Sequence, residues 1–215
     1  IMTTVIGRGV RVEIGTTEGS AKTVSAITSA NPGVATSTAH GLTTKSVGYF
    51  TGVEGMVQLE GQAARLGTVA TDTFALEDIK TTAYGTFSGS ADFIPITAWS
   101  TLSRATSYSI GGGEGEKLDD TVLLDDIKQE VQGLLAAQTV SFGLSSLTVS
   151  DAAMTALRTA ARDSAYLVFR ITLKDGSVRI FRGQPSLPGE DVQKAALGTG
   201  TFSVTVKGFV TEGAA

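Results

Sequence analysis

With 215 residues, 41% of them hydrophobic and 18% charged, the chain is long enough for one large β domain or two small ones. It has no cysteine and one histidine, His40, which excludes disulfides, thiolate metal sites and thiol nucleophiles and leaves no second histidine for a relay. The net charge of −4 argues against nucleic-acid binding by bulk electrostatics.

The first third of the chain predicts short strands. Residues 3–15 alternate apolar and charged side chains from Val10 to Ile14, the pattern of a half-buried strand. Residues 16–19 (TTEG) favour a turn, and residues 21–28 (AKTVSAIT) predict a second strand. From Ala30 to about residue 91, short Thr-rich and Gly-rich stretches without helical periodicity predict a small β module of its own.

The middle of the chain predicts longer strands on either side of an acidic loop. Residues 92–110 and 134–145 have strand character, the latter through Val140, Phe142 and Leu144. Residues 111–130 (GGGEGEKLDDTVLLDDIKQE) predict a loop that holds a third of the acidic residues. Its GGGEG start indicates a flexible linker, because it lacks the Gly-Lys-Ser/Thr ending of a phosphate-binding loop.

Residues 150–163 (SDAAMTALRTAARD) predict the only helix. Ser150 is the expected N-cap, and Met154, Leu157 and Ala161 fall on one apolar face. This face is expected to pack across a sheet.

A hairpin and a last strand follow the helix. Residues 165–173 (AYLVFRITL) alternate as a strand, and Asp175-Gly176 predicts a two-residue type I′ turn, in which both central residues need positive φ. Residues 177–183 (SVRIFRG) form the return strand. Residues 198–213 alternate Phe202, Val204 and Val206 with polar side chains, which predicts a long closing strand.

This order of helix, Asp-Gly hairpin, loop and closing strand resembles the tail tube proteins of long-tailed bacteriophages, the lambda type in particular. The resemblance is carried by LKDGSVRIFRG, QPSLPGEDVQKAALG and TFSVTVKGFVTEG, preceded by the helix and by LAAQTVSFGLSS. It covers about residues 97–213 and the first strand pair. It implies a mainly β, sandwich- or barrel-like tail tube fold with one packed α-helix, made of residues 1–29 and 93–215.

Residues 30–92 resemble a small β module of phage virion proteins, which is itself similar to a β half-domain of ubiquitin-activating enzymes. The matching stretches are His40-Gly41-Leu42, GVEGM at residues 52–56 and TFAL at residues 73–76, with Glu60-Gly61 where the module usually has an Asn-Gly turn. No ubiquitin chemistry is implied, because the chain has no cysteine for a thioester. We expect this insert on the outer surface of the tube.

The resemblance implies a structural virion protein that assembles into stacked six-membered rings, with strands of each subunit lining a channel for DNA. Its partners would be other copies of itself and the tape measure, tail terminator and tail-tip proteins, with DNA passing through without specific binding. For such a structural protein no cofactor, metal or catalysis is expected. No membrane contact is expected either, since no apolar run approaches the roughly 20 residues of a membrane span and no signal-peptide pattern is seen. The protein would be made and assembled in the host cytoplasm and reside in the phage tail. The alternative is a tail-tip or adhesin-like module that recognises a host surface.

We expect self-association to use the acidic loop and the Asp-Gly hairpin. The candidates are Glu114, Glu116, Asp119, Asp120, Asp125, Asp126, Asp175, Gly176, Arg179 and Arg182. The acidic loop is expected to become ordered in the assembly, rather than to stay solvated or to bind calcium, since the spaced oxygen ligands of a calcium loop are missing. We expect a structural or solvated role for His40, and solvent-facing or salt-bridged arginines rather than a nucleic-acid site.

Overall fold

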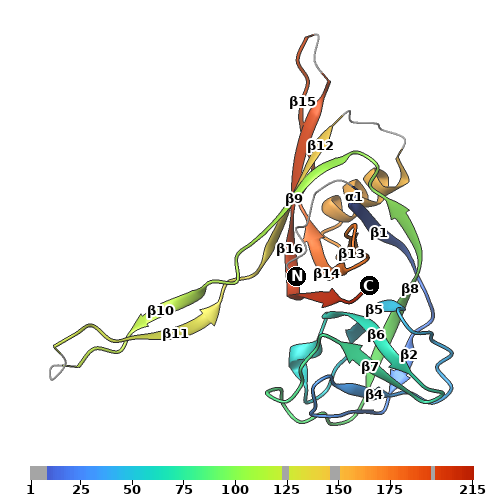
Figure 1. The fold of residues 1–215 in the computed structure, drawn as a ribbon, viewed down its shortest axis with the longest axis vertical. Helices are drawn as coiled ribbons and strands as arrows, with labels where there is room; N and C mark the ends of the chain where they lie inside the picture. The colour runs from blue at the N-terminus through green and yellow to red at the C-terminus, as the bar shows by residue number, and fades with distance from the viewer. Residues whose placement is uncertain (1–8, 123–125, 146–150, 195–196) are drawn as a thin grey trace.

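A computed structural model describes residues 9–122, 126–145, 151–194 and 197–215 of the chain. In these ranges the protein is mainly β with one α-helix, which confirms the predicted fold class (Figure 1). The helix is α1 (Ala152–Arg162), and a 3-10 turn, η1, spans Val57–Leu59. The strands are β1 (Arg11–Glu18), β2 (Lys22–Val24), β3 (Ala26–Ile27), β4 (Val34–Thr36), β5 (Val47–Thr51), β6 (Ala63–Val69), β7 (Thr73–Glu77), β8 (Ala91–Thr101), β9 (Ala105–Gly111), β10 (Gly115–Asp119), β11 (Glu130–Leu135), β12 (Thr139–Ser145), β13 (Leu167–Thr172), β14 (Val178–Pro185), β15 (Gly189–Asp191) and β16 (Thr199–Gly213).

One long antiparallel sheet runs through both halves of the body. Its order is β3-β4-β7-β6-β5-β8-β1-β13-β14-β16-β12-β9, with β15 added to β16 and β2 to β8. Strand β8 joins the halves, because Ala91–Pro95 pairs with β2 and β5 while Ile96–Thr101 pairs with β1. Strands β1, β13, β14, β16, β12 and β9 and the second half of β8 curl around α1 and form the upper unit in Figure 1. Strands β2–β7 and the first half of β8 form the lower unit.

The predicted pairing of the first two strand segments, residues 3–15 and 21–28, is wrong. Residues 21–28 form two short strands, and β2 pairs with β8 while β3 pairs with β4. Strand β1 lies between β8 and β13 instead. Its Glu13 is buried, not solvent-facing, because Arg170 on the neighbouring strand donates to it over 2.9 Å.

The core of the upper unit contains a row of stacked phenylalanines. Phe202 of β16 stacks on Phe142 of β12 at 4.8 Å between ring centroids, and Phe169 of β13 stacks on Phe181 of β14 at 5.1 Å. Phe142 and Phe169 link the two pairs at 6.2 Å. The alternation in β12, β13 and β16 is thereby confirmed, since one face of each strand points into this core.

Helix α1 packs into this core through Ala153, Met154 and Leu157, and Ala160 is buried as well. Ala160 and not the predicted Ala161 is the last buried residue of the face. The N-cap is Asp151, whose carboxylate accepts from the backbone of Ala153 over 3.0 Å, so the prediction of Ser150 is wrong by one residue. Ser150 itself lies outside the described residues.

The turn between β13 and β14 differs from the predicted two-residue type I′ turn. Leu173 accepts from the Gly176 backbone over 3.0 Å and donates to Ser177 over 2.8 Å, which closes a three-residue loop. Gly176 has φ +85° while Asp175 is not among the residues with positive φ. The Asp-Gly pair suits this loop as well, because only its last position needs the left-handed region that glycine favours.

The lower unit has a core of its own, built from Val24 and Ile27 through Phe93. This core therefore takes in residues on both sides of the 30–92 range. His40 is buried in it, accepts from the Leu42 backbone through Nδ1 over 2.9 Å and meets the Phe74 ring edge-on at 5.3 Å. These contacts give His40 a packing role.

The two units are joined by a third apolar cluster and by the end of β16. Val47 and Tyr49 of β5 pack on Val168, Val178 and Ile180 of the β13–β14 hairpin, so both faces of this hairpin are covered. Side chains of the lower unit also bind the backbone of β16. The contacts are Gln62 with both backbone groups of Phe209, Arg65 with the Ala214 carbonyl, Glu77 with the Ala214 amide and Asp78 with the Glu212 amide. The lower unit therefore takes the place of a further strand beside the end of β16.

Candidate functional site

Residues 114–122 and 126–135 form an arm that stands clear of the body (Figure 1). Strands β10 and β11 pair only with each other, from Gly115 opposite Leu135 to Asp119 opposite Glu130. The loop predicted for residues 111–130 is therefore wrong for Gly115–Asp119 and Glu130, which lie in strands, whereas residues 120–122 and 126–129 belong to no strand or helix. At about 3.3 Å per residue, the eight residues from Glu114 to Thr121 reach roughly 26 Å from the body. Gly112 and Gly113, with φ of +81° and +78°, turn the chain out of β9 into the arm.

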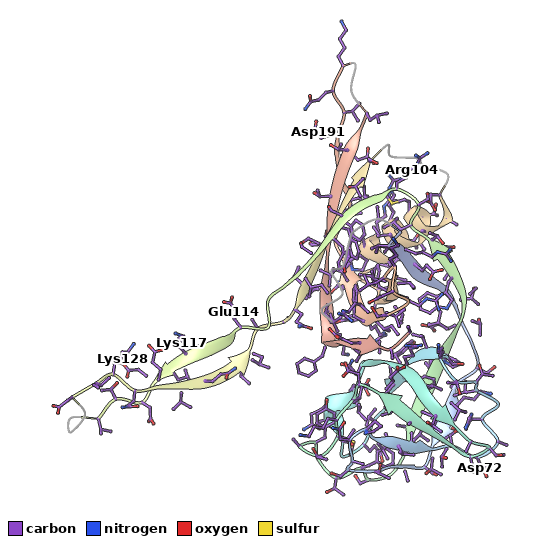
Figure 2. The ribbon with its side chains drawn as sticks, viewed as in Figure 1. Asp72, Arg104, Glu114, Lys117, Lys128 and Asp191 are labelled. Carbon is purple, nitrogen blue, oxygen red and sulfur yellow. The ribbon has the colours of Figure 1, made fainter. Side chains whose placement is uncertain are left out.

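The arm carries the negative charge of the protein. Residues 114–135 hold seven acids and two lysines, a net charge of −5, so the rest of the chain carries a net +1. Both lysines bind the same acid, since Lys117 and Lys128 lie 3.3 and 3.0 Å from Glu130. Figure 2 shows Glu114, Lys117 and Lys128 along the arm. Glu114, Glu116, Asp119, Asp120 and Asp126 make no ion pair within the described residues, and Asp125 lies outside them.

One face of the arm is apolar. Leu118 and Val131 lie directly opposite each other and so share a face, and they are 49% and 51% exposed. Leu135, beyond an irregularity in the ladder, is 50% exposed as well. Gly133 lies between Val131 and Leu135 and leaves room for the Leu118 side chain. An isolated two-stranded ribbon has no core of its own. Exposed apolar side chains on such a ribbon make it a candidate surface for contact with another protein.

The hairpin candidates lie in the body and not beside the arm (Figure 1). Arg179 binds Glu212 of β16 at 3.1 Å. Arg182 lies over the Tyr49 ring at 4.0 Å and over Tyr166 at 4.9 Å, and its buried Nε has no hydrogen-bond partner among the described residues. The arginines therefore hold the two units and β16 together, so the candidates form two separate groups.

Two acidic candidates accept hydrogen bonds from a residue two positions further along the chain. The hydroxyl and the backbone amide of Thr121 lower the pKa of Asp119, and those of Ser177 do the same to the pKa of Asp175. Both carboxylates thus stay ionised to lower pH than an ordinary aspartate.

Strand β9 leaves a free edge at the end of the sheet. It is the last strand in the order, and its outer edge has no partner within the described residues. The opposite end of the sheet is β3, which is only two residues long. Unpaired amide and carbonyl groups along a seven-residue strand are a template for pairing with another chain.

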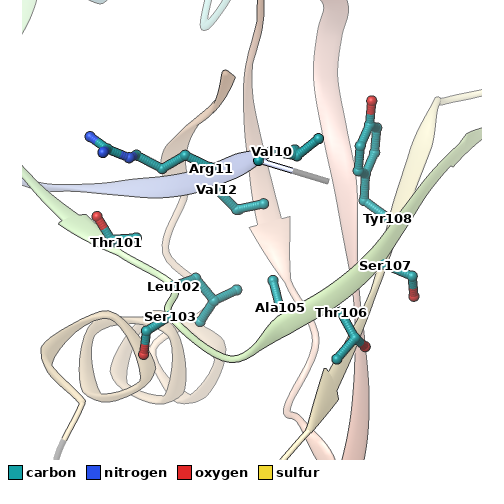
Figure 3. A pocket seen from close by; sticks show the side chains of 11 residues that line it. Val10, Arg11, Val12, Thr101, Leu102, Ser103, Ala105, Thr106, Ser107 and Tyr108 are labelled. Atoms are coloured by element: carbon teal, nitrogen blue, oxygen red, sulfur yellow. The ribbon is translucent and has the colours of Figure 1, made fainter. Parts of the chain in front are cut away.

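A pocket of about 510 Å³ lies between the start of β1 and the corner that joins β8 to β9 (Figure 3). Its polar groups are hydroxyls, such as those of Ser107 and Tyr108, and the Arg11 guanidinium. Among the described residues that line it there is no carboxylate or imidazole, so these side chains offer no general base.

In the ranges that the structure describes, no group of three or more His, Asp or Glu side chains is placed to hold a metal ion. Of the helical segments described, none has the length and hydropathy to cross a membrane.

The sequence profile of the phage tail tube protein family (TTP) matches residues 54–215, which include the arm, helix α1, the β13–β14 hairpin and β16. The chain belongs to this family. Tail tube proteins are structural components of the phage tail, so this protein is a structural tail protein. The comparison with curated proteins gave no match. The family match begins within the 30–92 range.

The sequence analysis of this tail tube protein missed the apolar face of the arm and the free edge of β9. The apolar residues Leu118, Val131, Leu134 and Leu135 were a usable signal for the arm, but the density of acids and glycines outweighed it. The free edge has no signal in the chain, because it depends on which strands pair.

Proposed function

We propose that this tail tube protein assembles into six-membered rings that stack into a hollow tube, through which DNA passes during ejection. The observation that carries the proposal is the arm, a charged ribbon with the apolar side chains of Leu118, Val131 and Leu135 exposed to solvent. Such a surface costs free energy in water and is stabilised when a second subunit covers it. The acidic candidates from Glu114 to Asp126 then lie at subunit contacts.

The free edge of β9 supports ring closure. In a ring each subunit meets the next through the same pair of different surfaces, and closure by rotation leaves no open edge. The curled strands of one subunit then continue into those of the next and line the channel. Outside the arm the chain carries a net charge of only +1, and the arm is acidic. Neither part attracts a polyanion strongly, so DNA can slide along the channel without binding to its wall.

The other assignments follow from the tube. Rings stack on one another and end at tape measure, tail terminator and tail-tip proteins, and assembly takes place in the host cytoplasm. The lower unit, taken as the 30–92 module, sits on the outside of the tube, a placement supported by its separate core.

The shape of the purified protein tests the proposal. Negative-stain images at rising protein concentration should show rings and then tubes of constant diameter. A tail-tip or adhesin-like module would stay a monomer or a small oligomer at every concentration, and that result would overturn the proposal.

Replacing Gly176 with valine should impair ring formation more than it lowers the melting temperature. Gly176 has φ +85°, and a Cβ there would lie 3.0 Å from that of Ala215. The strain is of order 1–2 kcal/mol, which lowers the melting temperature by about 2–8 °C. We expect a larger loss in assembly because the turn of the hairpin at residues 174–176 is exposed and would contact the next subunit.

Gly41→Val is the matched control for this strain. Gly41 also has positive φ, at +65°, and a Cβ there meets nothing within 4 Å. It should lower stability by a similar amount and leave the yield of tubes almost unchanged. Equal assembly defects in the two variants at equal stability would assign the β13–β14 hairpin to the scaffold alone.

A further inference from the structure

A second pocket, which we call the cationic pocket, lies where the upper and lower units meet. It has a volume of about 250 Å³. Its lining consists of Arg11, Glu13, Lys45, Val47, Arg65, Arg170, Thr172 and Val178. Four cationic side chains thus face one carboxylate in the lining, in a protein whose net charge is negative.

Two of the four cations are already bound within the subunit. Arg65 lies 3.2 Å from Glu77 and donates to the Ala214 carbonyl over 2.6 Å. Arg170 donates to Glu13 over 2.9 Å and stacks on the Trp99 ring at 4.2 Å. These two form a fixed positive wall.

The other two cations are available to a ligand. Arg11 is 65% exposed and lies 3.8 Å from Glu13, a carboxylate that already accepts from Arg170. Lys45 is exposed at the start of β5, and its ammonium group makes no hydrogen bond or ion pair within the described residues. The pocket therefore has room and charge for one or two carboxylates.

We propose that the cationic pocket receives acidic side chains from the arm of a second copy of this protein. The inference rests on the proposed assembly and names the surface that the arm meets. The charges are complementary, because the arm holds a net −5 while the rest of the chain holds a net +1. Five described acids on the arm make no ion pair within the described residues. The arm also projects far enough from the body to reach a neighbouring subunit.

The neighbouring residues Asp119 and Asp120 are the best-placed ligands of the arm. They lie where β10 ends, toward the tip, and hydrogen bonds from Thr121 hold the Asp119 carboxylate in place. Carboxylates are planar acceptors that match the guanidinium of Arg11, and Lys45 adds a mobile point charge. A nucleic-acid phosphate is the competing ligand, but an isolated pocket that contains a glutamate is a poor track for a long polyanion.

Charge reversal tests the pairing. Lys45→Glu should raise the protein concentration needed for tube formation by on the order of tenfold or more, because like charges then meet at the contact. Asp119→Lys with Asp120→Lys should have the same effect. Combining the arm and pocket variants should restore assembly toward that of the wild type. Lys80→Glu, at an exposed lysine outside the lining, is the matched control and should assemble normally.

Three outcomes would overturn the proposal. Lys45→Glu could assemble like Lys80→Glu, the combined variant could fail to recover, or Lys45→Glu could form tubes while losing affinity for a short DNA duplex. The last result would assign the pocket to nucleic acid. A chain without the arm separates this proposal from the proposed function, since normal tubes from that chain would remove the arm from assembly altogether. Melting curves of every variant should match that of the wild type, so that a folding defect is not read as an assembly defect.

Discussion

Replacing residues 114–135 with Asn-Gly should abolish tube formation and leave the rest of the chain folded. The arm makes no strand pairing with the body, and its own ladder closes at the hydrogen bond from the Ala136 amide to the Glu114 carbonyl. A short Asn-Gly link can join Gly113 to Ala136, because the hydrogen bond between Ala136 and Glu114 shows that the two ends of the arm lie close together. The shortened chain keeps all three apolar clusters of the body.

The measurement is negative-stain imaging together with a melting curve. We expect no tubes at concentrations where the wild type assembles, and a melting temperature within about 2 °C of the wild type, since the effect on the core is small. Hydrogen exchange gives a second readout, with residues 115–135 of the intact protein fast in the monomer and slow in tubes. Normal tubes from the shortened chain, or equally fast exchange in both states, would show that the arm has no part in assembly.

The apolar face of the arm can be tested without deleting it. Leu118→Ser, on the apolar face, should weaken assembly more than Val57→Ser, at an exposed residue of η1 in the lower unit. Both residues are exposed in the free subunit, so neither change should lower its melting temperature. Equal effects of the two changes on assembly would show that the arm does not bind through this face.

Phe169→Ala should lower the free energy of unfolding by about 3–5 kcal/mol. Phe169 is fully buried and is one of the two inner rings of the stack, in contact with Phe142 on one side and Phe181 on the other. Neighbouring rings on separate strands cannot close the cavity that its loss leaves. For a domain of this size the melting temperature should fall by roughly 6–20 °C.

Phe209→Ala is the control for this loss. Phe209 is 47% exposed, and Gln62 binds its backbone rather than its ring. Its replacement should lower the free energy of unfolding by about 1 kcal/mol or less. A fall for Phe169→Ala as small as that for Phe209→Ala would mean that the phenylalanine stack is not the core of the upper unit.

Several strands and the helix could be predicted because their signals are local. Alternation in residues 139–145, 167–173 and 199–206 marks strands with one face in the core, and the structure buries Phe142, Phe169 and Phe202 accordingly. The apolar spacing from Met154 to Leu157 marks the helix in the same way. The order of these elements also sufficed for the resemblance to tail tube proteins, which the family match confirms.

Three local predictions were wrong for reasons that lie outside the segment concerned. Asp175-Gly176 suits two kinds of turn, and the pairing of Thr172 with Val178 selects the three-residue loop. Residues 21–28 have a strand pattern, but β8 offers them a partner that β1 does not. The acidic stretch from Glu114 to Glu130 has a charge density that favours a loop, yet Gly115–Asp119 forms a strand that pairs with Glu130–Leu135 and with no strand of the body.

By itself the sequence determined the fold class, the place of the helix and the core face of the main strands, since each depends on periodicities of two or of three to four residues. Only the tertiary structure decided which strand edge has no partner strand, which apolar side chains of the arm are exposed, and which cationic side chains meet where the upper and lower units join. Arg11, Lys45, Arg65 and Arg170 lie far apart in the chain and have no common pattern. They form one pocket because the sheet brings β1, β6 and β13 together with the start of β5.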